Sequence, residues 1–241
     1  MAKNSDRFIT AFNRIDKAID MELENSRGIG FSKAVRILTK YNAVVRRYKD
    51  DLLEFAELRN AIVHNRLDTV QVIAEPHDSI VEQIEKIEDE ITKPKLVIPQ
   101  FEKKVHSFQL TDSLSDLLNA IDKQGYSKFP IYLGKEFKGL VTESGITKWL
   151  AKNKDASIIT TSIEEIMPYQ KEDNYQFVSR DTTVYHAIEA FKDRIGNGSR
   201  MDALLITNGG QLNEELLGII TVFDVMGYHE LGHDKTKVKS T

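Results

Sequence analysis

Cysteine is absent from the 241 residues of this sequence. Its absence excludes disulfide bonds, thiolate nucleophiles and cysteine-ligated zinc, and it is compatible with a reducing compartment. No apolar run approaches the roughly 18 residues that a membrane-spanning helix needs, and the N-terminal MAKNSDRF lacks the apolar core of a signal peptide. These absences predict a cytoplasmic protein without a membrane partner.

Several signatures of common enzymes and cofactor sites are also missing. The sequence has no Walker phosphate-binding loop, no Gly-x-Gly-x-x-Gly fingerprint and no Gly-x-Ser-x-Gly. We predict no metal site and no required cofactor. The net charge of −4 excludes the global basic field that dedicated nucleic-acid binders often carry.

The distribution of residue types predicts an α+β protein with two parts. Residues 1–95 contain no strand-like run and are expected to form a bundle of four helices, the second ending near Tyr48. A proline-containing linker follows. Two repeats that alternate strands and helices are expected at 101–155 and 160–230, with a polar tail at 231–241.

An unusual pattern ends the third predicted helix, in the segment 58–67. The apolar residues of this helix centre on the direction of Arg59, where a helix normally places leucine. Burying an unpaired guanidinium is costly, so Arg59 must meet an acid, a ligand or a polar cleft. Asn60 and His64 are four residues apart and share a flank. A structural interpretation remains open, in which Arg59 pairs with an acid on a neighbouring helix and His64 caps the helix end.

The Arg59-Asn60-x-x-x-His64 motif in a short all-helical module resembles the HEPN superfamily, whose signature is Arg, four to six residues and His. The resemblance implies a metal-independent endoribonuclease that forms a homodimer, with Arg59, Asn60 and His64 as catalytic residues. His64 would act as general acid or base, and Arg59 would stabilise the charge on the phosphate. Many HEPN-like modules are inactive, so a non-catalytic docking or dimerisation function is the alternative.

A basic stretch lies beside this motif, because no acidic residue occurs between Glu24 and Asp50. Four of its cations are expected to share one face of the second helix: Lys33, Arg36, Lys40 and Arg47. One interpretation is a surface that binds the RNA backbone. The other is a solvated basic face, balanced by the acids of the fourth helix.

An internal repeat organises the second half of the chain. The segment 137–146, with Gly139-x-x-Thr142, matches the segment 216–225, with Gly218-x-x-Thr221-x-x-Asp224. Each copy is expected to contain a strand, a helix, a strand, a hairpin turn, a strand and a helix. A strand-end threonine would precede a helix whose N-terminal amides favour an anion.

The doubled pattern resembles a pair of CBS domains, or Bateman module, over about residues 101–229. The resemblance implies clefts for adenine nucleotides such as AMP, ADP or ATP, with Thr221 contacting phosphate and Asp224 holding the ribose hydroxyls. It also implies that the base is surrounded by Phe177, Val178, Met201 and Ala203. The structural alternative is that Asp224 only caps its helix.

The first copy keeps Thr142 but has Gly145 where the ribose-binding aspartate should be, so one intact cleft is expected. The whole sequence is then interpreted as an adenine-nucleotide sensor whose HEPN-like domain is a nucleotide-regulated endoribonuclease. The alternative is a non-catalytic nucleotide-binding regulator, or dimerisation protein, that acts through a partner.

Overall fold

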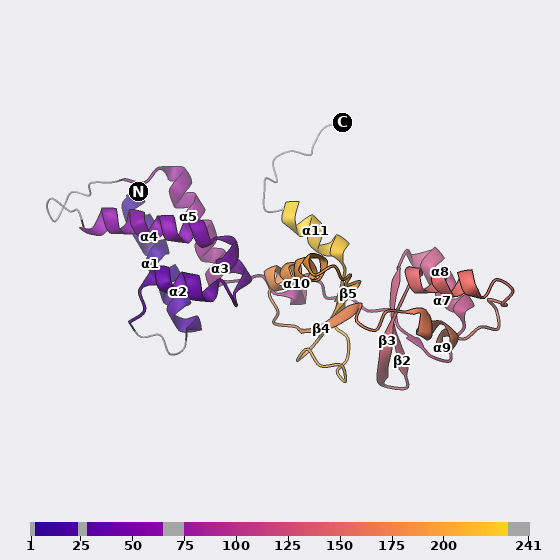
Figure 1. Ribbon diagram of the computed structural model, residues 1–241. Coiled ribbons are helices and arrows are strands. Elements are labelled where there is room, and N and C mark those ends of the chain that lie inside the picture. Colours follow the sequence, from indigo (N-terminus) through magenta and orange to yellow (C-terminus); the bar gives the residue numbers. More distant parts are fainter. Residues whose placement is uncertain (1–2, 24–27, 65–74, 231–241) are drawn as a thin grey trace, which may run out of the picture. The chain divides into compact units, whose positions relative to one another are not determined.

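The computed structural model describes residues 3–23, 28–64 and 75–230 (Figure 1). The chain divides into two compact units, Met1–Lys95 and Leu96–Thr241, which we call the helical unit and the repeat unit. Among the described residues, no helix has the length and apolar character needed to cross a membrane. The arrangement of helices followed by two small mixed sheets confirms the predicted α+β class.

The described part of the helical unit contains five helices. They are α1 (Asn4–Glu22), α2 (Phe31–Leu38), α3 (Ala43–Arg47), α4 (Lys49–His64) and α5 (Asp78–Thr92). α1 packs along α5, and α4 packs against α1 and α2. The contact between α1 and α5 buries apolar residues at helical spacing on both helices, and Arg7 forms a salt bridge with Glu85 at 2.7 Å.

The prediction of a single second helix ending near Tyr48 is wrong, because the chain breaks between α2 and α3. The Asn42 side chain accepts the backbone N–H groups of Val44 and Val45 at 2.9 and 3.0 Å, which starts a new helix. Lys40 therefore lies in the turn between the helices.

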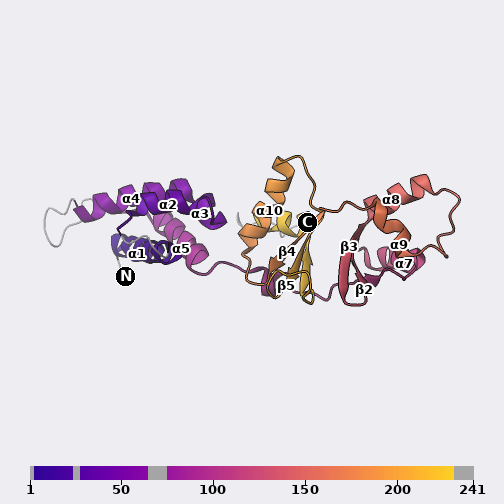
Figure 2. The same cartoon turned by 60° about the horizontal axis from the view of Figure 1, so that its bottom comes forward.

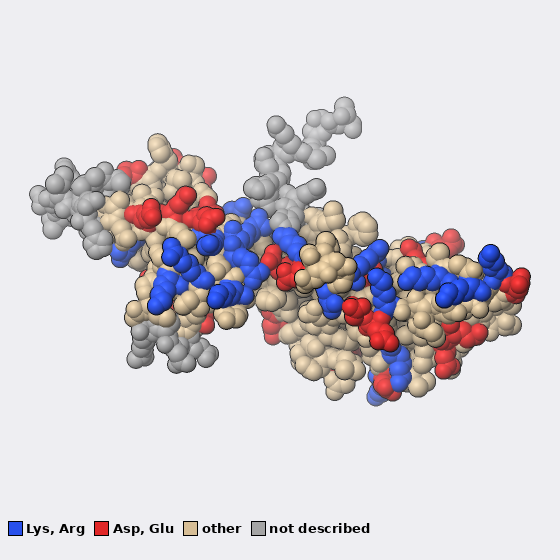
Figure 3. All heavy atoms as spheres, in the orientation of Figure 1, with Lys and Arg blue, Asp and Glu red and all other residues tan. Residues whose placement is uncertain are grey.

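The break also corrects the predicted common face of four cations. Lys33 and Arg36 lie on α2, Arg47 lies on α3, and Lys40 lies between them. All four side chains are exposed, and Figure 3 shows lysine and arginine side chains gathered over α2 and α3. Their predicted contact with RNA stays a prediction.

The repeat unit contains two three-stranded sheets with the same topology. In each sheet the first strand pairs parallel with the second, and the second pairs antiparallel with the third. The first sheet has β1 (Phe108–Gln109), β2 (Lys128–Leu133) and β3 (Glu136–Thr142). The second has β4 (Tyr175–Ser179), β5 (Ala203–Thr207) and β6 (Gly218–Ile220).

Helices cover the outer faces of both sheets, as Figures 1 and 2 show. The helices are α6 (Val97–Gln100), α7 (Leu114–Gln124), α8 (Glu143–Lys152), α9 (Ile163–Ile166), α10 (Val184–Gly196) and α11 (Val222–Glu230), with a 3-10 turn η1 (Met167–Tyr169). The inner faces meet in a shared apolar layer that includes Leu140, Leu205 and Ile219. The two sheets therefore form one packed body, with the ends of β3 and β6 available to build sites between the repeats.

Truncating the shared layer should destabilise the repeat unit. Leu205 is fully buried, so we expect Leu205→Ala to lower the free energy of unfolding by about 2–5 kcal/mol. Leu212→Ala is the matched control, since Leu212 is 56% exposed, and its effect should stay within about 0.5 kcal/mol. Urea unfolding followed by circular dichroism measures both; equal effects would contradict the packing of the two sheets.

Candidate functional site

A pocket of about 320 Å³ lies beside the end of β6 in the repeat unit. Thr221 follows β6, and Asp224 lies in the first turn of α11. Ile219 and Phe223 line it from the same repeat, and the other lining residues come from 103–106 and 125–128, the segments that lead into β1 and β2 of the first repeat. The pocket is therefore built from both repeats.

The two carboxylate oxygens of Asp224 have different surroundings. Oδ2 accepts hydrogen bonds from the backbone N–H and the hydroxyl of Thr221, both at 2.7 Å. This geometry supports the structural alternative that Asp224 helps to cap its helix. Oδ1 lies 3.9 Å from the Lys103 ammonium, beyond hydrogen-bonding distance, and the side chain is 31% exposed. The cap thus uses one oxygen and leaves the other as an acceptor for a ligand.

The charge of the pocket favours an anionic ligand. Its lining contains three lysines, Lys103, Lys104 and Lys128, and one carboxylate, that of Asp224. The N-terminal amides of α11 add positive potential at the same place. Val105 and Ile219 supply apolar surface, and Tyr126 supplies a partly exposed ring. A ligand with an apolar ring system, hydroxyls and phosphate would find a partner for each part.

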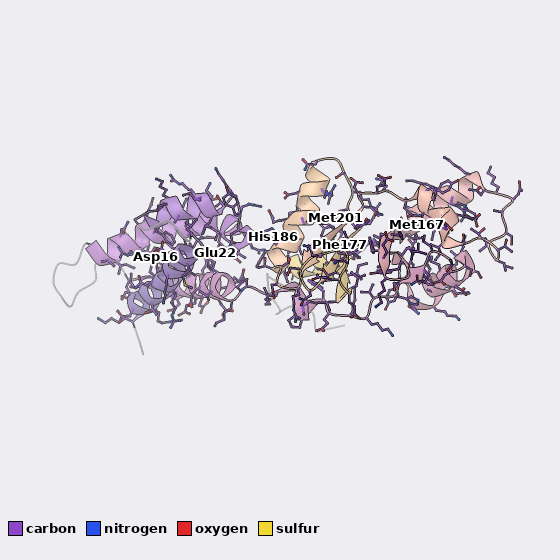
Figure 4. The ribbon with its side chains drawn as sticks, turned by 90° about the horizontal axis from the view of Figure 1, so that it is seen from below. Asp16, Glu22, Met167, Phe177, His186 and Met201 are labelled. Atoms are coloured by element: carbon purple, nitrogen blue, oxygen red, sulfur yellow. The ribbon has the colours of Figure 1, made fainter. Side chains whose placement is uncertain are left out.

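The four predicted base contacts do not line this pocket. Phe177 packs against Phe137 with ring centroids 5.1 Å apart, and Ala203 lies in the layer between the sheets. Val178 and Met201 belong to the core of the second repeat; Figure 4 labels Phe177 and Met201. The facing sheets bring Thr221 and Asp224 against segments of the first repeat, and the predicted contact of these four residues with an adenine base stays a prediction.

The sequence analysis did not predict that the segments 103–106 and 125–128 line the pocket at Asp224, although the internal repeat carried a signal for them. A local pattern relates the residues that lead into the first and second strands only to the Thr-x-x-Asp segment of their own copy. Because the two sheets pack face to face, residues that lead into β1 and β2 line the cleft at Asp224. Residues that lead into β4 and β5 line the cleft at Thr142.

The corresponding cleft at Thr142 is smaller, about 70 Å³. Thr142 caps α8, because its hydroxyl accepts the backbone N–H of Gly145 at 3.2 Å. The cleft also contains Lys148 and Arg200, and Arg200 pairs with Asp202 at 3.0 Å. Thr142 thus lines a cleft with little room, and its predicted contact with a nucleotide stays a prediction.

The helical unit has its own pocket, of about 470 Å³, at Arg59. Asn60, Lys33 and Asp16 line it together with Arg59, and Arg59 Nη1 donates a hydrogen bond to Asn60 Oδ1 at 3.2 Å. Of the predicted residues, the pocket lining includes these three: Arg59, Asn60 and Lys33. His64 is the last residue of α4, and its side chain lies outside the described part of the chain.

Asp16, labelled in Figure 4, is the acid of this pocket. Burial raises the pKa of the Asp16 carboxyl, the charge of Asp20 raises this pKa further, and the charge of Arg59 lowers it in part. Since the net direction is upward, burial and Asp20 together outweigh the attraction to Arg59. A strong structural ion pair with Arg59 would instead lower the pKa of Asp16.

This balance predicts that Asp16→Asn stabilises the protein at neutral pH. Because the folded pKa of Asp16 is raised, its charged form costs stability, and that cost vanishes below the unfolded pKa of about 3.9. We expect the free energy of unfolding to rise at pH 7 and to be unchanged near pH 3. Glu54→Gln, on an exposed position of α4, is the control. Destabilisation at pH 7 would instead favour the structural pairing of Asp16 with Arg59.

The prediction of no metal site has one exception in the sequence, at the C-terminal end. His229-Glu230-Leu231-Gly232-His233 has the His-Glu-x-x-His spacing that zinc enzymes use on a helix. These side chains lie outside the described residues. Within the described part of the chain, no group of three or more histidine, aspartate or glutamate side chains could hold a metal ion.

Comparison with known proteins identifies one domain of the chain. Residues 163–230 match the CBS domain family. No curated protein matches the chain.

Solved structures of CBS domains resemble the chain at low sequence identity. The CBS domain pair of protein MJ0100, in complex with 5′-methylthioadenosine and S-adenosyl-L-methionine, is 21% identical, with a TM-score of 0.44; the match covers 58% of this chain and 98% of that one. The CBS domains of a transcriptional regulator from Streptococcus pneumoniae are 20% identical, with a TM-score of 0.39 and coverage of 55% and 97%. The CBS-domain protein ATU1752 from Agrobacterium tumefaciens is 16% identical, with a TM-score of 0.41 and coverage of 53% and 90%.

The family match spans α9 to α11 and includes Thr221 and Asp224. The second repeat, at residues 163–230, is therefore a CBS domain.

Proposed function

We propose that the pocket at Thr221 and Asp224 binds an adenine nucleotide and that the protein senses the concentration of that nucleotide. The observation that carries this proposal is the Asp224 carboxylate, whose Oδ2 is held by Thr221 while Oδ1 is left beside a pocket lined by lysines. A carboxylate oxygen fixed in this way is suited to accept hydrogen bonds from the two hydroxyls of a ribose.

Each part of the nucleotide would have a partner in the pocket. Lys103, Lys104 and the N-terminal amides of α11 would bind the phosphates. Val105 and Ile219 would cover the faces of the base. Binding of this kind changes the activity of another domain or partner only if the nucleotide has different affinities for two conformations.

Because of the lysines, we expect the pocket to bind phosphorylated ligands more tightly than unphosphorylated ones. We expect affinity to rise from adenosine through AMP to ATP, and the difference to shrink as salt is raised. Lys104→Ala should weaken ATP binding by roughly three- to tenfold, equivalent to about 1 kcal/mol, with little effect on adenosine. Isothermal titration calorimetry at two salt concentrations measures this.

Two controls sharpen that experiment. Lys135→Ala removes an exposed cation on the hairpin after β2, away from the pocket lining, and should leave ATP binding unchanged. S-adenosyl-L-methionine, the cationic ligand of MJ0100, should bind more weakly than ATP. Equal affinity for adenosine and ATP at low salt would contradict the role of the lysines.

A second candidate function belongs to the helical unit. The observation that favours it is the pocket shared by Arg59, Asn60 and Lys33, in which an arginine and an amide line one opening. Following the resemblance to HEPN domains, we propose RNA cleavage at this pocket, with His64 as general acid or base. The site would be completed across a homodimer, and nucleotide binding in the repeat unit would regulate it. If the helical unit is inactive, it would instead dock a partner protein.

A further inference from the structure

Gln170 makes, in the first repeat, the contacts that Asp224 makes in the second. The backbone N–H and the hydroxyl of Thr142 both donate to Gln170 Oε1, at 3.0 and 3.1 Å. The same two groups of Thr221 donate to Asp224 Oδ2. Thr142 and Thr221 occupy corresponding positions, each at the end of the third strand of its sheet. One side-chain oxygen therefore satisfies the same two donors in both repeats, although it comes from a different part of the chain.

Gly145 makes room for this glutamine. It is the third residue after Thr142, as Asp224 is the third after Thr221. A Cβ atom at position 145 would overlap the amide nitrogen and oxygen of Gln170. A side chain at 145 and the present position of Gln170 therefore exclude each other. The glycine at position 145 and the placement of Gln170 against Thr142 therefore depend on each other.

The replacement differs from the carboxylate in its second polar atom. The remaining atom of the Gln170 amide is a nitrogen, which donates to the Ile166 carbonyl at 3.4 Å. An amide nitrogen is a donor only, so it cannot accept a ribose hydroxyl proton as Asp224 Oδ1 can. The cleft that remains, about 70 Å³, is much smaller than the pocket at Asp224, about 320 Å³.

We infer that Gln170 fills the ribose position of the first cleft, so that each chain binds one nucleotide, at Asp224. The stoichiometry rests on the proposed nucleotide binding; the competition between Gln170 and a side chain at position 145 does not. The inference therefore allows two separate tests, one of stability without any ligand and one of binding.

The stability test is a double-mutant cycle on the full chain. Gln170→Ala should lower the melting temperature by about 2–6 °C, because it leaves both Thr142 donors without their acceptor. In the Gly145→Asp background the same substitution should change the melting temperature by less than about 1 °C, since the aspartate takes over both donors. Gln176→Ala, at an exposed position of β4, is the matched control and should have no effect in either background. Equal drops in both backgrounds would overturn the role of Gln170.

The binding test counts nucleotides per chain by calorimetry with ATP. We expect one in the wild type, and two in Gly145→Asp/Gln170→Ala, where the first cleft regains its carboxylate and loses the glutamine. Adding Asp224→Ala to the double variant should leave only the new site. Two nucleotides per wild-type chain would overturn the inference, as would a double variant that still binds one. No binding by the wild type would reject the proposed nucleotide site, while the stability cycle would still decide the role of Gln170.

Discussion

Asp224→Ala is expected to weaken ATP binding by roughly 100-fold or more. Hydrogen bonds to a charged group contribute about 1.5–3 kcal/mol each, and Asp224 Oδ1 would accept two from the ribose. Isothermal titration calorimetry on the full chain measures the change, and the thermal shift produced by ATP should fall with it. Because a ligand at 100 times its dissociation constant adds about 2.7 kcal/mol of stability, that shift is readily seen in the wild type.

The cap made by Asp224 requires a second variant, since Asp224→Ala also removes the acceptor for Thr221. Asp224→Asn keeps an oxygen that can accept the Thr221 N–H but lacks the negative charge. It should therefore preserve more of the ligand-free stability than Asp224→Ala and still lose most of the ATP affinity. Asp193→Ala, at an exposed position of α10, is the matched control. Binding by Asp224→Ala within threefold of the wild type would leave Asp224 only its structural role.

Arg59→Ala is expected to reduce RNA cleavage by roughly 10²- to 10³-fold in kcat, if the helical unit is a ribonuclease. The guanidinium would stabilise charge that develops on the phosphate during cleavage, a role that alanine cannot supply. His64→Ala should cost roughly 10²- to 10⁴-fold, as expected for a general acid or base. A labelled RNA, incubated with EDTA to test metal independence and with or without ATP, gives the rates.

Lys17→Ala controls for the removal of a cation from the helical unit, because Lys17 is exposed on α1 and does not line the Arg59 pocket. It should cleave RNA at the wild-type rate. A wild-type protein that cleaves no RNA, with or without ATP, would contradict the ribonuclease candidate and favour docking of a partner. Cleavage that survives both Arg59→Ala and His64→Ala would indicate a contaminating nuclease or another site.

The features that could be read from the sequence depend on local patterns. The α+β class followed from the change between helical periodicity and strand–helix alternation. The repeat was visible because Gly139-x-x-Thr142 and Gly218-x-x-Thr221 occupy corresponding places in the two sheets. The position of Asp224, three residues after a strand-end threonine, already fixed it in the first turn of a helix.

The features that escaped sequence reasoning depend on tertiary packing or on competing local signals. Gln170 is 28 residues from Thr142, and only the folding of η1 against α8 brings the two together. The first-repeat lining of the Asp224 pocket arises from the face-to-face sheets. The break at Asn42 has a local signal, because an asparagine can cap a helix. The helical spacing of the apolar residues around it nevertheless predicts one continuous helix.

The central claim is most directly tested by titrating the wild-type chain with ATP in a calorimeter. The predicted result is saturable binding with one ATP per chain, stronger than that of adenosine or GTP. The same titration with AMP and ADP identifies the preferred ligand. No heat of binding and no thermal shift with any adenine nucleotide at millimolar concentration would contradict the claim. The pocket at Asp224 would then have only its capping role, and the paired sheets would be a structural scaffold.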